Sequence, residues 1–183
     1  MTKLGYLVLI TGFILFQNSI CWSQEGITIV DKKIDFGYRP SPKRNIKQII
    51  VHSVFNNIGG EKYNIELIIK QFSIYKVSAH YIIDRQGIIY NLVDENNIAF
   101  HAGKSRLPNG QSNINSSSIG IELLTAYDES PTKQQIEALI KLVLDIKKRH
   151  SIDFILRHSD IAPGRKTDPW NMDWNTFISQ VSH

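Results

Sequence analysis

The sequence reads RHSDIAPGRKTDP from Arg157 to Pro169, so an imidazole, several cations and a carboxylate fall within thirteen residues. Pro163 and Gly164 interrupt any helix or strand, and we therefore expect a shaped loop that brings His158 and Asp168 together. Loops of this kind commonly carry catalytic groups. Because a neutral imidazole and a carboxylate are both zinc ligands, the segment predicts half of a zinc hydrolase site.

Short apolar and β-branched segments outside this loop are typical of strands. They cover residues 47–53, 79–84, 88–93, 118–124 and 154–156. The second and third flank Arg85-Gln86-Gly87, a hairpin signal in which the glycine can adopt a positive φ angle. We expect these two segments to pair as antiparallel strands.

Helical periodicity marks three further segments. They cover residues 64–75, 131–150 and 174–181. In the longest one, Gln135 follows Thr132 by three residues, which is the spacing of a capping box. Strands and helices mixed in this order predict an α/β fold, with a single domain whose central mixed β-sheet is flanked by helices.

The N-terminal residues have the pattern of a secretion signal. Lys3 precedes an apolar run at residues 7–16, which is too short for a comfortable transmembrane span, and small or polar residues follow it. The predicted parts of the chain are a signal peptide at residues 1–23, an ordered lead-in at residues 24–45 and a single domain at residues 46–183.

Export is the expected fate of this chain, to a periplasm or to the medium, with no integral membrane span in the mature protein. A lipoprotein acylated at Cys21, the one cysteine, ranks second. A typical lipobox has leucine three positions before the cysteine and a small residue just before it, where this chain has Asn18 and Ile20. The mature protein would therefore lack disulfides, and we expect a monomer.

The charge of the chain is mildly basic, with 21 lysine and arginine against 17 aspartate and glutamate residues and a formal net charge of +4. This balance is compatible with an anionic polymer as partner. The basic residues are scattered rather than grouped with aromatic residues, so nucleic-acid binding is not expected.

A zinc hydrolase needs three protein ligands and one open position, and His158 and Asp168 would supply two of the three. Spacing alone does not identify the third, since His52 lies more than 100 residues upstream. Residue types alone leave other interpretations open. A lone histidine at the end of an apolar strand is more often a structural or surface residue. An acidic residue such as Glu122 inside an apolar strand more often faces outward or pairs with a buried base, and a loop lysine such as Lys166 is usually a solvated charge.

Three segments together carry a resemblance to a known family. The loop at 157–169, Ile49-Ile50-Val51-His52 and Ser118-Ile119-Gly120-Ile121-Glu122-Leu123 resemble the zinc-dependent N-acetylmuramoyl-L-alanine amidases of the type 2 family, relatives of the peptidoglycan recognition proteins. The resemblance covers roughly residues 46–174. The resemblance implies the fold of that family. It also places this chain with the bacterial branch, which has an aspartate as its third ligand, whereas the phage-type branch has a cysteine at that position.

The resemblance also implies a role for each matching residue. His52, His158 and Asp168 would bind one Zn²⁺ per chain. Glu122 would be the general base that moves a proton from the attacking water to the leaving nitrogen, and Lys166 would stabilise the oxyanion. His101, in Ala99-Phe100-His101-Ala102-Gly103, matches a segment that contacts the muramoyl part of the substrate, so it is expected to bind substrate.

One departure from the family concerns a catalytic tyrosine. The phage-type branch has this tyrosine just before the histidine of the hairpin strand, whereas this chain has Ala79 before His80. Tyr81 is two positions away, and a regular strand would point it to the same face as Ala79, so it is an alternative proton carrier to Glu122. His80 itself is expected to be a structural histidine rather than a ligand.

The expected activity is hydrolysis of the amide between the lactyl group of N-acetylmuramic acid and L-alanine, with peptidoglycan or muropeptides as partners. A binding module of the same fold, containing zinc but without catalysis, is the main alternative. A zinc peptidase that cuts within the stem peptide is a third. The presence of all three ligands together with Glu122 and Lys166 favours catalysis.

Overall fold

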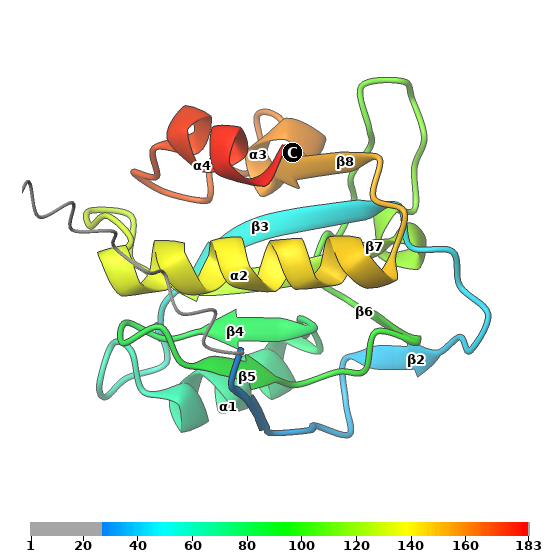
Figure 1. Ribbon diagram of the computed structural model, residues 1–183. Helices are drawn as coiled ribbons and strands as arrows, with labels where there is room; N and C mark the ends of the chain where they lie inside the picture. The colour runs from blue at the N-terminus through cyan, green and yellow to red at the C-terminus, as the bar shows by residue number, and fades with distance from the viewer. Residues whose placement is uncertain (1–26, 183) are drawn as a thin grey trace, which may run out of the picture.

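A mixed six-stranded sheet forms the centre of the computed structural model, which describes residues 27–182 (Figure 1). The strands lie in the order β1-β5-β4-β7-β3-β8. Their bounds are β1 (Ile29–Asp31), β3 (Gln48–Val54), β4 (Tyr81–Ile83), β5 (Ile89–Asn91), β7 (Ser118–Leu124) and β8 (Phe154–Arg157). A second, two-stranded sheet pairs β2 (Tyr38–Pro40) with β6 (Asn97–Ala99).

Four neighbouring strands of the large sheet, β4, β7, β3 and β8, run parallel to one another. The predicted hairpin is confirmed, since β5 pairs antiparallel with β4 and Gly87 in the turn has a φ of 83°. Because parallel strands end at the same edge of a sheet, the residues at the carboxyl ends of β3, β7 and β8 come together there.

Helices cover both faces of the sheet, as predicted. In the view of Figure 1, α2 (Lys133–Arg149) lies in front of the sheet and α1 (Ile65–Tyr75) behind it. The fourth helix, α4 (Trp174–Val181), packs beside α2. The capping box of α2 is confirmed, because the hydroxyl of Thr132 accepts a hydrogen bond from the Gln135 amide and the Gln135 side chain accepts one from the Thr132 amide.

The two faces of β7 have different roles. Ile119, Ile121 and Leu123 are buried in the core that α2 covers. Because side chains alternate along a strand, Gly120 and Glu122 lie on the opposite face, the one that α1 covers. The candidate site is on that second face, at the carboxyl edge of the sheet.

The predicted lead-in is built into the sheets. Its residues form β1, which pairs parallel with β5, and β2, which pairs antiparallel with β6. Arg44 then ties this segment to the core, because its guanidinium donates hydrogen bonds to the carbonyls of Asn97 and Ser118. The predicted signal peptide at residues 1–23, with Cys21, lies outside the described residues.

Two details differ from the prediction. His158 does not lie in an irregular loop but opens a single helical turn, α3 (His158–Ile161), because Asp160 accepts a hydrogen bond from the Arg157 amide. The strand β4 starts only at Tyr81, so strand alternation does not extend back to Ala79. Tyr81 consequently lies in the core under α2, whereas Ala79 packs in the core under α1.

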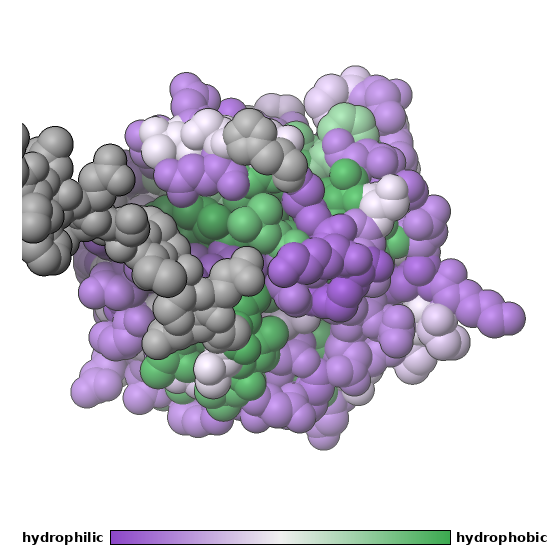
Figure 2. Space-filling model, viewed as in Figure 1, coloured by the Kyte–Doolittle hydropathy of each residue, from purple (hydrophilic) through white to green (hydrophobic). Residues whose placement is uncertain are grey.

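The surface on the α2 side is mainly hydrophilic, and hydrophobic residues show in one area between α2 and α4 and in another in its lower half, where β1 and β5 lie (Figure 2). Ile29, Val30 and Ile88 are the exposed large hydrophobic residues of that area. Within residues 27–182, none of the helices has the length and apolar character needed to cross a membrane.

Candidate metal and catalytic site

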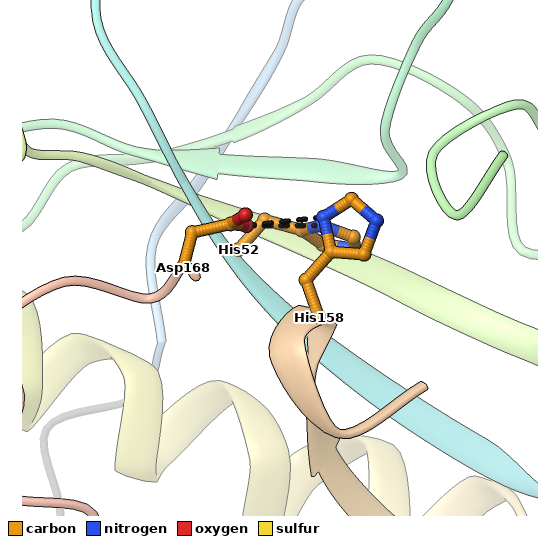
Figure 3. A group of neighbouring side chains, drawn as sticks. All are labelled: His52, His158 and Asp168. Carbon is orange, nitrogen blue, oxygen red and sulfur yellow. Dashed lines mark hydrogen bonds and ion pairs between the residues drawn. The ribbon is translucent and has the colours of Figure 1, made fainter. Parts of the chain in front are cut away.

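Three side chains from two distant parts of the chain converge at the carboxyl edge of the sheet (Figure 3). His52 comes from β3, His158 from the first position of α3 and Asp168 from the loop that follows α3. The ligand atoms of the three lie within 4.8 Å of one another, and all three residues are buried. The structure therefore brings together the three predicted zinc ligands.

The ring nitrogens of the two histidines point at each other. Nδ1 of His52 lies 2.9 Å from Nδ1 of His158, which in turn lies 3.1 Å from Oδ2 of Asp168. The other nitrogen of His158, Nε2, lies 3.3 Å from the carbonyl of Ala102, an arrangement in which Nε2–H donates and Nδ1 keeps its lone pair. The lone pair on Nδ1 of His158 thus points at Nδ1 of His52, and a cation or a proton between the two rings would satisfy it.

The protonation states of the ligands suit a metal. Burial lowers the pKa of His52 to about 4, so its ring is neutral near neutral pH. Burial would raise the pKa of Asp168, but its close contacts with His158 and His52 outweigh burial and hold that pKa well below its usual range. Two neutral imidazoles and one carboxylate are the donor set of a catalytic zinc site, and these residues fit the ion.

Glu122 faces the same region from the neighbouring strand. It is paired in register with His52, and it is 8% exposed. Its Oε2 is buried without a hydrogen-bond partner among residues 27–182. Burial, reinforced by the charge of Asp168, raises the pKa of Glu122 well above its usual value. A buried carboxyl group with a raised pKa in a cleft is suited to proton transfer.

An open cleft of about 450 Å³ gives access to this cluster. Its wall includes Glu122, His158 and Asp168 together with Lys166, whose side chain is exposed. The other side chains that shape it are largely aromatic or polar, and include Phe55, Gln71, Tyr75, Phe100 and Trp170. Lys166 and Glu122 thus border one cleft beside the three candidate ligands, and their catalytic roles stay predictions.

The predictions for His80, His101 and Tyr81, which lie near the cluster, have different outcomes. His80 is structural, because its Nδ1 accepts a hydrogen bond of 3.0 Å from the Gly120 amide and its Nε2 lies 3.1 Å from the carbonyl of Asn97. His101 is buried and lines the cleft, so its predicted binding of substrate stays a prediction. The alternative prediction that Tyr81 carries the proton is wrong, since its hydroxyl lies on the α2 side of the sheet and donates a hydrogen bond to Glu95.

Three contacts around the ligands were not predicted. Ala102 supplies the backbone carbonyl opposite Nε2 of His158, and Arg165 donates to the same carbonyl at 3.0 Å. Ser118 contacts the ring of His101. Backbone carbonyls leave no trace in a sequence, but Ser118 stands four residues before Glu122 on a predicted strand, and this spacing places both on one face.

A scan against protein families matches residues 42–171 to the family described as N-acetylmuramoyl-L-alanine amidase. The match covers most of the chain and includes all three candidate ligands, Glu122 and Lys166. The chain therefore belongs to the N-acetylmuramoyl-L-alanine amidase family, the type 2 amidases that the motifs resemble.

Individual relatives agree with this assignment. The chain is 38% identical over 110 residues to the 1,6-anhydro-N-acetylmuramyl-L-alanine amidase AmpD of Haemophilus influenzae, a match that covers 58% of this chain and 59% of that protein. The aligned part thus spans less than two thirds of that relative's length.

Solved structures share the fold over a longer stretch. A selenomethionine derivative of AmpD superposes with a TM-score of 0.68 at 28% identity, covering 82% of this chain and 94% of that one. The amidase AmiD of Escherichia coli, solved with the substrate anhydro-N-acetylmuramic acid-L-Ala-D-gamma-Glu-L-Lys, has a TM-score of 0.63 at 29% identity, covering 78% of this chain and 60% of that one. These matches confirm the predicted mixed α/β fold.

Proposed function

We propose that this protein is a zinc-dependent amidase that hydrolyses the bond between the lactyl group of N-acetylmuramic acid and L-alanine in peptidoglycan or muropeptides. Membership of the amidase family supports the choice of bond. The observation that carries the catalytic part is Glu122, whose buried Oε2 has no hydrogen-bond partner among the described residues and which lies in register with the ligand His52. An unpartnered buried carboxyl oxygen is costly to keep in a fold without a use for it.

The proposed role of each site residue follows from the chemistry of its side chain. His52, His158 and Asp168 would hold the metal, and the chemistry supplied by bound zinc is polarisation of the scissile carbonyl and acidification of the attacking water. Glu122 takes a proton from that water and returns it to the leaving nitrogen, since a raised pKa makes its carboxylate a stronger base. The exposed ammonium of Lys166 stabilises the negative charge that develops on the carbonyl oxygen.

The proposed place of action is outside the cytoplasm. The pattern of Lys3 followed by an apolar run at residues 7–16 supports a cleaved signal peptide at residues 1–23. Acylation at Cys21 ranks second, for the lipobox reasons given above. Export would bring the cleft into contact with the wall polymer and with fragments released from it.

Mass spectrometry of products tests the proposal. Purified peptidoglycan is treated with the mature protein, with the Glu122→Gln variant, and with the mature protein plus a zinc chelator. We expect the mature protein alone to release intact stem peptides that begin with L-alanine. Binding to peptidoglycan without new products would replace the proposal by a recognition module, and cuts within the stem peptide would replace it by a zinc peptidase.

A further inference from the structure

A chain of hydrogen bonds runs from His52 away from the candidate metal site. Nε2 of His52 lies 3.0 Å from Nδ1 of His101, and Nε2 of His101 lies 3.1 Å from the hydroxyl of Ser118. That hydroxyl donates a hydrogen bond of 2.7 Å to the carbonyl of Ile114. His52, His101 and Ser118 are all buried, which limits competition from water for these contacts.

The Ser118 end of the chain fixes the direction of the hydrogen bonds. A serine hydroxyl has one proton, and Ser118 gives it to Ile114. Its oxygen can then only accept from His101, so His101 carries its proton on Nε2 and leaves Nδ1 as an acceptor. That acceptor faces Nε2 of His52, and His52 must therefore carry its own proton there.

The metal end of the chain requires the same direction. A proton on Nε2 of His52 leaves the lone pair on Nδ1, the atom that faces His158 and Asp168. The contacts at the two ends of this series of hydrogen bonds therefore indicate the same tautomer of His52, with the proton on Nε2.

Gly120 provides the space that this arrangement needs. A Cβ atom added to Gly120 would lie 2.4 Å from Cγ of His101, far closer than two carbon atoms can approach without a shift. The ring of His101 therefore lies directly on the backbone of β7 between Ser118 and Glu122. Only glycine allows a ring at this place to reach both His52 and Ser118.

We propose that His101 and Ser118 are positioning residues that fix the tautomer and the orientation of His52 as a zinc ligand. The inference rests on the proposed zinc-dependent function. It gives His101 a role different from substrate binding, because both ring nitrogens already face protein partners. Groups that orient a ligating histidine typically contribute about 10- to 100-fold to metal affinity.

Two variants test the positioning role. His101→Phe keeps an aromatic ring over Gly120 but removes both nitrogens, and Ser118→Ala removes the acceptor while leaving both histidines. Leu139→Ala, in the core under α2, is a matched control for general destabilisation, since Leu139 is fully buried and belongs to the core on the opposite face of the sheet.

The first readout is the tautomer of His52 in the zinc-free protein, from long-range ¹H–¹⁵N NMR correlations of the imidazole rings near neutral pH. The second is zinc affinity by competition with a chromogenic chelator. We expect wild-type His52 to carry its proton on Nε2. His101→Phe should mix the two tautomers and weaken zinc binding by about 10- to 100-fold, Ser118→Ala should have a smaller effect in the same direction, and Leu139→Ala should change neither readout.

A proton on Nδ1 of His52 in the wild type would overturn the inference. So would wild-type zinc affinity in His101→Phe or, if that variant does not fold, an unchanged tautomer and affinity in Ser118→Ala. Failure of the wild type to bind zinc would instead overturn the proposed function, and the NMR readout would still decide the tautomer by itself.

Discussion

His52 on β3 and Glu122 on β7 are register partners in the parallel pair at the centre of the sheet. A proposed metal ligand and the proposed proton carrier are thus held side by side by backbone hydrogen bonds of two buried strands. The other two proposed ligands, His158 and Asp168, come from the segment that follows β8. The site therefore joins a rigid half, set by the sheet, to a half that depends on the fold of one loop.

The proton-transfer role of Glu122 predicts the effect of Glu122→Gln. The amide keeps the shape of the side chain but cannot accept a proton, so turnover should fall by about 10² to 10⁴ while zinc stays bound. Steady-state hydrolysis of a muropeptide, with metal content measured on the same samples, checks this. Glu137→Gln, on α2, is the control, and full activity in Glu122→Gln would remove this residue from the mechanism.

The ligand role of Asp168 predicts a loss of metal-dependent stability in Asp168→Asn. Zinc that binds only the folded state stabilises it by about 4 kcal/mol at 1,000 times the dissociation constant. Thermal unfolding with and without zinc should show this increase for the wild type but not for the variant, whose metal content should fall well below one ion per chain. Asp145→Asn, on α2, should behave as the wild type. Stoichiometric zinc in Asp168→Asn would contradict the assignment.

Buried neutral His80 predicts that the zinc-free protein loses stability in acid. Burial, followed by the charge of Arg44, lowers the pKa of His80 from 6.5 to about 3 in the folded state. The folded state therefore disfavours the protonated ring. This contribution is fully present above about pH 6.5 and is lost as the pH falls from there towards 3, with a slope of up to about 1.4 kcal/mol per pH unit.

Urea unfolding between pH 7 and pH 5 in the presence of a chelator measures that slope. In His80→Asn the amide oxygen can still accept from the Gly120 amide, but the group no longer titrates. The free energy of unfolding of the variant should therefore depend less steeply on pH than that of the wild type. Equal slopes in the two proteins would show that His80 is readily protonated in the folded state.

The position of Tyr81 predicts that Tyr81→Phe retains full hydrolytic activity. Its hydroxyl donates a hydrogen bond of 2.8 Å to Glu95 on the far side of the sheet, and this bond to a carboxylate contributes roughly 1–3 kcal/mol to stability. The variant should thus unfold at a lower urea concentration with unchanged kcat. A large fall in kcat at unchanged metal content would instead show that Tyr81 takes part in proton transfer.

Much of this architecture can be predicted from local patterns. The helix α2 has long, regular periodicity, and the capping box at Thr132 marks its start through contacts between near neighbours. The strands β3 and β7 are short apolar segments of strand length. The ligands could be assigned because the loop around His158 and Asp168 resembles a family. His52, more than 100 residues away, needed that resemblance, since nothing near it in sequence marks a ligand.

Other features depend on contacts that a sequence does not display. The three-residue strands β1 and β2 are too short for a periodic signal and exist because β5 and β6 offer edges to pair with. Ala79 and Tyr81 lie on different sides of the sheet because β4 begins only at Tyr81, and the sequence does not mark that boundary. The partners of His101 become visible only when β7 and the segment before it are folded together.

Arg44 limits how far the chain can be shortened from its N-terminal side. Its guanidinium is the donor to backbone carbonyls of both β6 and β7, at Asn97 and Ser118. A fragment that starts at residue 46 would contain every residue with a proposed chemical role, yet it would leave these two carbonyls without that donor beside the strand that carries Glu122. The smallest fragment of this protein suitable for grafting or fusion is accordingly longer than the segment that contains the site residues, and it begins upstream of Arg44.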